Sequence, residues 1–347
     1  MREPVLLAVI GLGACADSAG ARPPVAPSPD STSPGLLVAN KADATLGIHS
    51  LPEGTLVATL PTGKGPHEIA ISPNGRVAVV SNYGEKEPGN TLTVVSLEQR
   101  TVSSTISLGE HRRPHGIAFL PDGKRAVVTV ETSRAVIIVN VETGAVEHVI
   151  PTDQDGSHML ALAPGGARAY VASIGSGSIT PIDLNSLTSA EPVQVTSASE
   201  AIAVTPDGGE VWTASLKENV VVALDTSLEV RQEVEALGVP IRIVAVPDGT
   251  AMLISNVQAS AVQVVDVATR TSTEILLPPL PGIGPTAAPV GIAVAADSGV
   301  AYVSLVAEDR VAIIDIPSRK VIGHMPTGRS PDGVAYVAEL PAAAAVM

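Results

Sequence analysis

Residues 114–150 read PHGIAFLPDGKRAVVTVETSRAVIIVNVETGAVEHVI and contain four short β-rich runs. The run HGIAFL ends at Pro-Asp-Gly, RAVVTV follows, and the polar segment ETSR leads to AVIIVNV. The turn Glu-Thr-Gly then leads to AVEHVI. Runs of β-branched residues bounded by turn residues, without a 3.6-residue period, predict four strands joined by tight turns. Most of the chain repeats this unit.

The Pro-Asp-Gly turn has diverged copies along the chain, at successive intervals of 48, 43, 42, 41 and 49 residues. The copies begin at Pro73, Pro121, Pro164, Pro206, Pro247 and Ala296. A matching apolar run follows each copy, from RVAVVSN at 76–82 to VAYVSL at 300–305, which argues against chance. A period of 40–50 residues with four strands per repeat indicates β-propeller blades.

The two ends of the chain set the number of blades. Six complete repeats begin near Pro66, Pro114, Ser157, Ser199, Pro240 and Pro289. Before them, residues 36–40, 46–51 and 56–60 predict three strands of a blade that lacks its first strand, and residues 332–337 supply one unpaired first strand. We therefore expect an all-β, seven-bladed β-propeller over residues 35–338, with four-stranded antiparallel blades. The C-terminal strand would close the ring by pairing into the N-terminal blade, which removes free sheet edges.

The repeat resembles the YVTN-type (YncE-like) β-propeller repeat of bacterial exported and surface proteins. The second copy shows it best, in the segments PHGIA (114–118), PDGK (121–124), VVTV (127–130), IIVN (137–140) and ETG (142–144). The resemblance covers about residues 35–338 and implies the propeller fold. It implies no particular activity, because one fold carries many functions.

The N-terminus resembles a bacterial lipoprotein signal. Arg2 supplies positive charge, residues 5–12 are apolar, and Leu-Gly-Ala precedes Cys15, the single cysteine of the chain. This pattern predicts a signal peptide at 1–14 and a lipid on Cys15. Residues 15–34 have the Pro/Ser/Ala composition of a tether, and 339–347 form a C-terminal tail. We expect export to the periplasmic or cell-surface side of a membrane. An ordinary secretory signal and a cytoplasmic N-terminus remain alternatives.

Composition excludes several functions. A net charge of −14 and 2% aromatic residues argue against nucleic-acid binding, which needs basic patches and stacking rings. With one cysteine, no intrachain disulfide can form. No apolar run approaches the ~18 residues of a membrane span, so membrane contact is expected only through the N-terminal lipid. We expect a monomeric propeller.

Loop variation indicates which face of the propeller carries function. The first-to-second and third-to-fourth turns are short and stereotyped, whereas the loops at the opposite face vary, at 84–90, 110–113, 153–156 and 277–289. Binding residues commonly lie on variable loops held by a rigid scaffold. We place any site on this face; neutral surface insertions are the alternative.

One position of the repeat is rich in metal-binding residue types. Three residues before the alanine of each first strand, the seven blades carry His67, His115, His158, Glu200, Arg242, Val290 and Asp332. Equivalent positions should lie side by side around the channel mouth, and we call these residues the channel ring. His67, His115, His158 and Glu200 would suit one Zn, Cu, Fe or Mn ion. The alternative is a polar ring without a metal, in which Glu200 pairs with Arg242. We expect His49, His111, His148 and His324 to be solvated surface residues.

Two functions fit these residues. The first is a binding propeller that presents its loop-rich face and channel mouth to a protein, peptide, glycan or small molecule. The second is a metal-dependent enzyme, either lactonase- or hydrolase-like or associated with a redox system, in which the ion activates water or a carbonyl. Asp332 and Glu68 are candidates for its general base. A Gly-x-Ser-x-Gly nucleophile motif is absent from the sequence.

Overall fold

The computed structural model describes residues 33–342. The expected signal peptide, Cys15 and residues 15–32 of the tether lie outside the described residues, as do residues 343–347 of the tail. Strands account for the described regular structure except for one 3-10 turn, η1 (Glu131–Ser133). No helix in this part of the chain is long and apolar enough to cross a bilayer.

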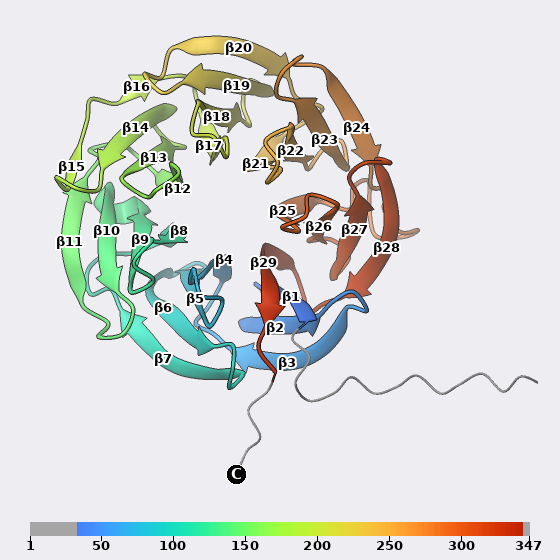
Figure 1. Ribbon diagram of the computed structural model, residues 1–347, viewed down its shortest axis with the longest axis horizontal. Helices are drawn as coiled ribbons and strands as arrows, with labels where there is room; N and C mark the ends of the chain where they lie inside the picture. The colour runs from blue at the N-terminus through green and yellow to red at the C-terminus, as the bar shows by residue number, and fades with distance from the viewer. Residues whose placement is uncertain (1–32, 343–347) are drawn as a thin grey trace, which may run out of the picture. The chain divides into compact units, whose positions relative to one another are not determined.

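The described residues form seven antiparallel sheets arranged as blades around a ring (Figure 1). Blade 1 contains β29 (Pro331–Leu340), β1 (Ser33–Asn40), β2 (Thr45–Ser50) and β3 (Thr55–Pro61). Blade 2 contains β4 (Pro66–Ile71), β5 (Val77–Gly84), β6 (Pro88–Ser96) and β7 (Thr101–Ser107). Blade 3 contains β8 (Pro114–Phe119), β9 (Arg125–Val130), β10 (Ala135–Asn140) and β11 (Val146–Pro151).

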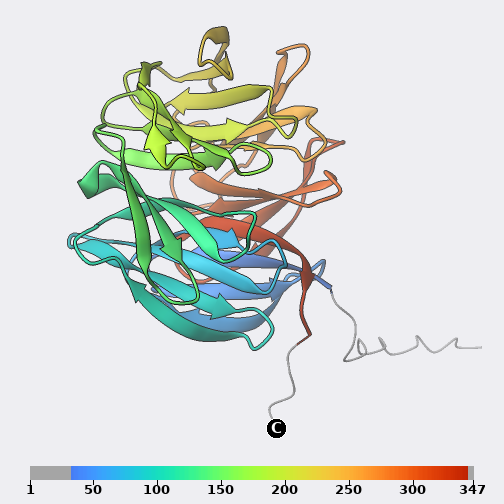
Figure 2. The same cartoon turned by 60° about the vertical axis from the view of Figure 1, so that its left-hand side comes forward.

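The remaining blades follow in chain order around the ring, as the oblique view in Figure 2 shows. Blade 4 contains β12 (Ser157–Leu162), β13 (Arg168–Ser173), β14 (Ser178–Asp183), β15 (Thr188–Ser189) and β16 (Val193–Gln194). Blade 5 contains β17 (Ser199–Val204), β18 (Glu210–Ser215), β19 (Val220–Asp225) and β20 (Val230–Glu235). Blade 6 contains β21 (Pro240–Ala245), β22 (Ala251–Asn256), β23 (Ala261–Asp266) and β24 (Ser272–Leu276). Blade 7 contains β25 (Pro289–Val294), β26 (Val300–Leu305), β27 (Arg310–Asp315) and β28 (Lys320–Pro326).

The C-terminal strand closes the ring, as the sequence predicts. β29 pairs with β1 in antiparallel register from Ser33↔Leu340 to Asn40↔Pro331, and blade 1 is built from both ends of the propeller. β1 begins two residues inside the expected tether, and β29 ends two residues inside the expected tail. Blade 4 departs from the pattern because its outer strand is split into β15 and β16. Pro192, which cannot donate a backbone hydrogen bond, lies between the two pieces.

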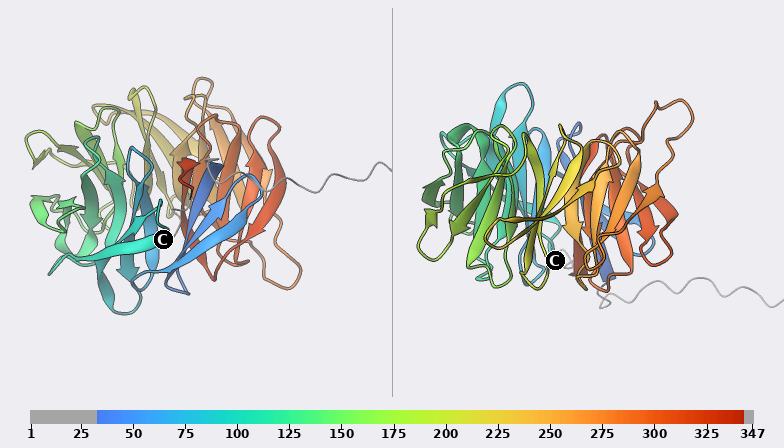
Figure 3. Two further views of the ribbon diagram at one scale, coloured as in Figure 1. Left: turned by 60° about the horizontal axis from the view of Figure 1, so that its bottom comes forward. Right: turned by 90° about the horizontal axis from the view of Figure 1, so that it is seen from above.

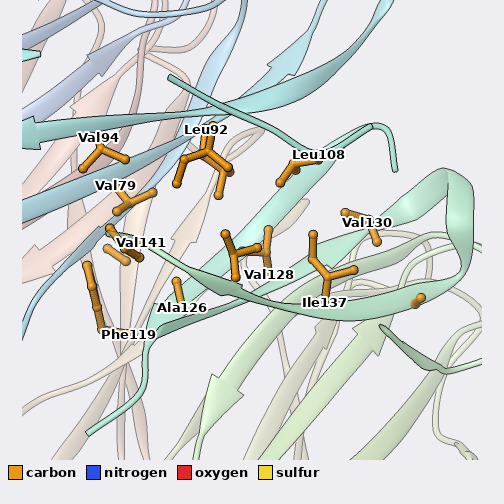
Figure 4. Close-up of a cluster of buried hydrophobic side chains, with 14 residues drawn as sticks. Val79, Leu92, Val94, Leu108, Phe119, Ala126, Val128, Val130, Ile137 and Val141 are labelled. Carbon is orange, nitrogen blue, oxygen red and sulfur yellow. The ribbon is translucent and has the colours of Figure 1, made fainter. Parts of the chain in front are cut away.

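Apolar side chains between neighbouring blades form the core. The second strands are buried almost without interruption, because both of their faces pack against adjacent sheets. Between blades 2 and 3, for example, Val79 and Leu92 pack against Val128 and Ile137 (Figure 4). All four side chains are fully buried. This packing fixes each inner strand relative to the next.

Glycines let the inner strands approach one another closely. A Cβ on Gly333 would lie 2.0 Å from the carbonyl oxygen of His67, and one on Gly291 would lie 2.2 Å from that of Asp332. A Cβ on Gly116 would lie 2.7 Å from the amide nitrogen of Leu160. The first two distances are to ring residues of the next blade. The glycines therefore bring ring residues of neighbouring blades together.

Gly333→Ala is expected to destabilise the protein by about 2 kcal/mol or more, because the new methyl group must push two inner strands apart. Gly323→Ala in β28 is the matched control, since its Cβ would lie 3.6 Å from its nearest neighbour, an ordinary contact. Urea denaturation of the two variants measures the difference. Equal midpoints would contradict this account of the glycines.

Candidate functional site at the channel mouth

The structure places the predicted channel ring at the start of the inner strands, on β4, β8, β12, β17, β21, β25 and β29. Register shifts occur at this position, for example between Pro66 and Ile69 and between Pro114 and Ile117. A β-bulge changes the direction of local side chains, which explains why ring residues leave the normal in–out alternation. Blade 6 differs, because pairing resumes at Arg242 itself and Ile241 takes the bulged position.

Three imidazoles lie in contact along one side of the channel ring. The ring centroid of His115 is 4.1 Å from that of His67 and 3.7 Å from that of His158. His115 is fully buried, and neither of its nitrogens has a hydrogen-bond partner among the described residues. Burial, with the nearby His158, lowers the pKa of His115 well below its ordinary value. His115 is therefore a neutral imidazole at pH 7, which is the form that binds metals.

His158 is held between two carboxylates. Its Nδ1 lies 2.6 Å from Oε1 of Glu131, and its Nε2 lies 3.1 Å from Oε1 of Glu200. Burial alone would lower the pKa of His158, but the hydrogen bonds to Glu131 and Glu200 outweigh it and raise the pKa to about 9. His158 is therefore an imidazolium at pH 7, with both nitrogens donating. The pKa of Glu200 is lowered, because its bond to His158 outweighs the effect of burial.

Two further residues of the channel ring, Arg242 and Asp332, form ion pairs. Arg242 donates to Oε1 of Glu68, although blade 6 lies across the ring from blade 2, and Nζ of Lys41 lies 3.0 Å from Oδ2 of Asp332. Burial would raise the pKa of Asp332, but the charges of the nearby His67, Lys41 and Arg242 outweigh it and lower the pKa. The expected alternative pairing of Glu200 with Arg242 is therefore wrong.

Two overlapping groups in the described chain could hold a metal ion. One contains His67, Glu68 and His115, and the other contains His115, Glu131 and His158. Within each group the potential ligand atoms lie within 4.8 Å of one another. Glu200 belongs to neither group and is bound to His158 instead. The three predicted histidines are thus divided between two groups that share His115, and Glu200 lies outside both.

The sequence prediction missed three polar residues that contact the ring. Lys41 and Glu131 directly follow the second strands of blades 1 and 3, and Tyr83 has the same repeat position in blade 2, where β5 continues to Gly84. The same position in blades 4–7 carries apolar residues, namely Ile174, Leu216, Val257 and Val306. This change of residue type within one repeat position is the signal that could have identified them. At this repeat position the mouth is therefore polar in blades 1–3 and apolar in blades 4–7.

Tyr83 links the missed residues to the imidazole rings. Its hydroxyl donates to Oε2 of Glu131 over 2.8 Å, and its ring centroid lies 5.3 Å from those of both His67 and His115. The guanidinium of Arg113 lies 4.6 Å from the centre of the Tyr83 ring. Burial and the Glu131 carboxylate raise the pKa of Tyr83 to about 12, so that its hydroxyl remains a donor. Tyr83 therefore orients Glu131 toward His158.

The loops expected to vary lie around this face. The β5–β6 hairpin and the loop between β24 and β25 rise on the same side of the propeller (Figure 3, right). The first is shorter than the expected loop at 84–90, because β5 continues to Gly84 and β6 begins at Pro88. The histidines outside the ring differ in one case from expectation. His49 is buried rather than solvated, with its Nδ1 3.3 Å from the Gly54 carbonyl oxygen.

Comparisons with known proteins bear on the fold. Neither a protein-family model nor a curated protein matches this chain. Among solved structures, the chain is similar to hydrazine synthase of Kuenenia stuttgartiensis, with a TM-score of 0.67 and 19% identity over 78% of this chain and 89% of that one. At this identity the similarity supports the β-propeller fold alone.

Proposed function

We propose that this protein is an exported β-propeller of YVTN type, tethered by a lipid on Cys15, that binds a ligand at the channel mouth of its loop-rich face. One observation carries the binding proposal. Buried polar atoms of four ring residues have no hydrogen-bond partner within the described chain, namely Nδ1 of His67, both ring nitrogens of His115, Nη1 of Arg242 and Oδ1 of Asp332.

Unpaired buried polar atoms are costly and uncommon, at about 1–3 kcal/mol each. Several at one place favour a bound ligand that supplies the missing partners. The set offers both donors and acceptors, and apolar residues such as Leu216 and Val257 follow the second strands on the far side of the ring. A ligand with a polar or metal-binding group and an apolar side would match both the ring residues and these apolar residues.

Binding is tested by thermal unfolding of the full chain with a panel of divalent metals, small carboxylates, sugars and short peptides. At 100 times its Kd, a ligand should stabilise the protein by about 2.7 kcal/mol, which is a shift of about 5 °C. We expect such a shift in the wild type and its loss in His115→Gln. If no probe stabilises the wild type more than His115→Gln, the proposal of a binding site at the mouth fails.

The second candidate is a metal-dependent enzyme, because two histidine–carboxylate groups lie at the mouth. An ion there would polarise a carbonyl or lower the pKa of a bound water. Glu68 and Asp332 lie beside His67, although each is already paired with a cation. Lactone and ester hydrolysis by the metal-loaded protein tests this function. Turnover that disappears in both His67→Ala and His115→Ala would favour the enzyme over the binding propeller.

Export and lipid attachment have a separate test. Mass spectrometry of the mature protein from a bacterial membrane fraction should find a lipid-modified Cys15 at the N-terminus, with residues 1–14 removed. An intact N-terminus, or an unmodified cysteine, would overturn the lipoprotein proposal without affecting the channel-mouth site.

A further inference from the structure

We infer that the channel mouth binds one divalent transition-metal ion through His67, Glu68 and His115, with Asp332 beside them, and that His158, Glu131 and Glu200 are not ligands. This inference rests on the proposed ligand site and specifies its ligand. It also selects one of the two overlapping groups of possible metal ligands. This ligand set replaces the one predicted from repeat position alone, which was His67, His115, His158 and Glu200.

Hydrogen bonding separates the two groups. Both nitrogens of His158 are already bonded to carboxylates, so neither has a lone pair to offer an ion. The nitrogens of His115 and Nδ1 of His67 lack hydrogen-bond partners among the described residues. An ion on the first group uses these nitrogens as they stand, whereas an ion on the second would have to displace at least one of the two carboxylate bonds of His158.

The carboxylates near His67 are placed to complete the ligand set. Oε1 of Glu68 and Oδ1 of Asp332 each lie 3.5 Å from Nδ1 of His67. Oδ1 of Asp332 is buried and has no hydrogen-bond partner in the described chain, while its Oδ2 is bound to Lys41. Two imidazoles with one or two carboxylates suit Zn, Fe(II) or Mn, and lack the soft sulfur ligands that favour Cu(I).

The local charge also favours a cation. The ring and its direct ionic partners contain four carboxylates, of Glu68, Glu131, Glu200 and Asp332. Three cations face them: Lys41, Arg242 and the imidazolium of His158. These carboxylates outnumber the three cations by one in a largely buried site, where an uncompensated charge is unfavourable. A divalent ion bound there would offset this excess of carboxylates.

His158 then has a positioning role. It is fixed by Glu131 and Glu200, and its ring lies against that of His115. The hydroxyl of Thr129 donates to the backbone oxygen of His158 over 2.5 Å and so joins blades 3 and 4 at this point. The imidazole of His115 therefore lies between the rings of His67 and His158, and the fixed position of His158 helps to hold it there.

Titration of the full chain with Zn2+, Mn2+ and Co2+ by calorimetry, after treatment with a chelator, tests the inference. Removing a ligand should weaken affinity at least as much as the 10–100-fold typical of outer-shell changes. We expect a loss of about 100-fold or more in His67→Ala and in Glu68→Gln, and less than about 10-fold in His158→Gln. His148→Ala, on the exposed face of β11, is the control and should bind as the wild type does. Circular dichroism checks that each variant is folded.

Two outcomes would overturn the inference. Loss of binding in His158→Gln with full binding in His67→Ala would assign the ion to the other group, while leaving a ligand at the mouth. Failure of all three metals to bind the wild type would exclude the ion. The proposed binding function would then stand or fall on the panel of non-metal probes, so the two failures are distinguishable.

Discussion

A protein truncated after residue 330 is expected to lose its cooperative unfolding transition. The deletion removes β29, which is the inner strand of blade 1 and pairs with β1 along its length. β29 also buries Val337 and Leu340, each worth about 1.5–3 kcal/mol, and leaves β1 with an open edge. Together with the lost backbone hydrogen bonds, the cost approaches the 5–15 kcal/mol that stabilises a whole domain.

Deletion of residues 343–347 is the matched control, because every described strand remains. Thermal unfolding followed by circular dichroism should give a wild-type melting temperature for this control. The longer deletion should give a broad or absent transition and should tend to aggregate through the open edge of β1. If both deletions melt like the full chain, β29 does not close the ring.

The blade count and the closure could be predicted because they depend on local patterns. A turn such as Pro121-Asp122-Gly123 has a sequence signature, and the apolar run after it marks the strand that packs on both faces. The same turn repeated at intervals of 41–49 residues is a non-local feature that a single sequence displays. Only the outer strand of blade 4 departs from the expected four strands, and Pro192 explains the break.

The candidate site was predictable in position but not in its pairings. Repeat alignment placed His67, His115 and His158 on neighbouring blades, and the structure brings their rings into contact. The alignment could not show that Arg242 reaches across the ring to Glu68. In blade 6 the bulged position is taken by Ile241, so Arg242 lies one residue beyond the bulge that carries the ring residue in other blades. Pairing across a ring depends on side-chain length and direction, which the repeat does not encode.

Residues that differ from the other repeats at the same position provide a further signal for the candidate site. Glu68 occupies the position that is glycine in blades 1, 3 and 7, where Gly333, Gly116 and Gly291 follow the ring residue. An ionisable residue in place of a glycine that permits close backbone approach is unusual on packing grounds alone. Likewise, Glu131 follows a second strand where blades 4–7 have apolar residues. Departures from the repeat are therefore an additional signal for candidate site residues.

His158→Gln is expected to destabilise the metal-free protein by about 3 kcal/mol at pH 7, because it leaves the carboxylates of Glu131 and Glu200 buried without their cation. The folded-state pKa of His158 is about 9, above its ordinary value near 6.5. Proton binding therefore favours the folded state. This contribution is complete below pH 6.5, declines between pH 6.5 and 9, and is absent above about pH 9.

Urea denaturation of the wild type and His158→Gln at pH 6, 7, 8 and 9.5, with chelator present, measures this contribution. The difference in unfolding free energy should shrink by about 2 kcal/mol between pH 7 and 9.5, because only the wild type loses the His158 proton. Other titrating groups largely cancel in the difference. His148→Gln, whose side chain is exposed, should follow the wild type throughout. If the difference in unfolding free energy between the wild type and His158→Gln stays constant with pH, His158 is not an imidazolium bound to Glu131 and Glu200. His158 would then again be a possible metal ligand.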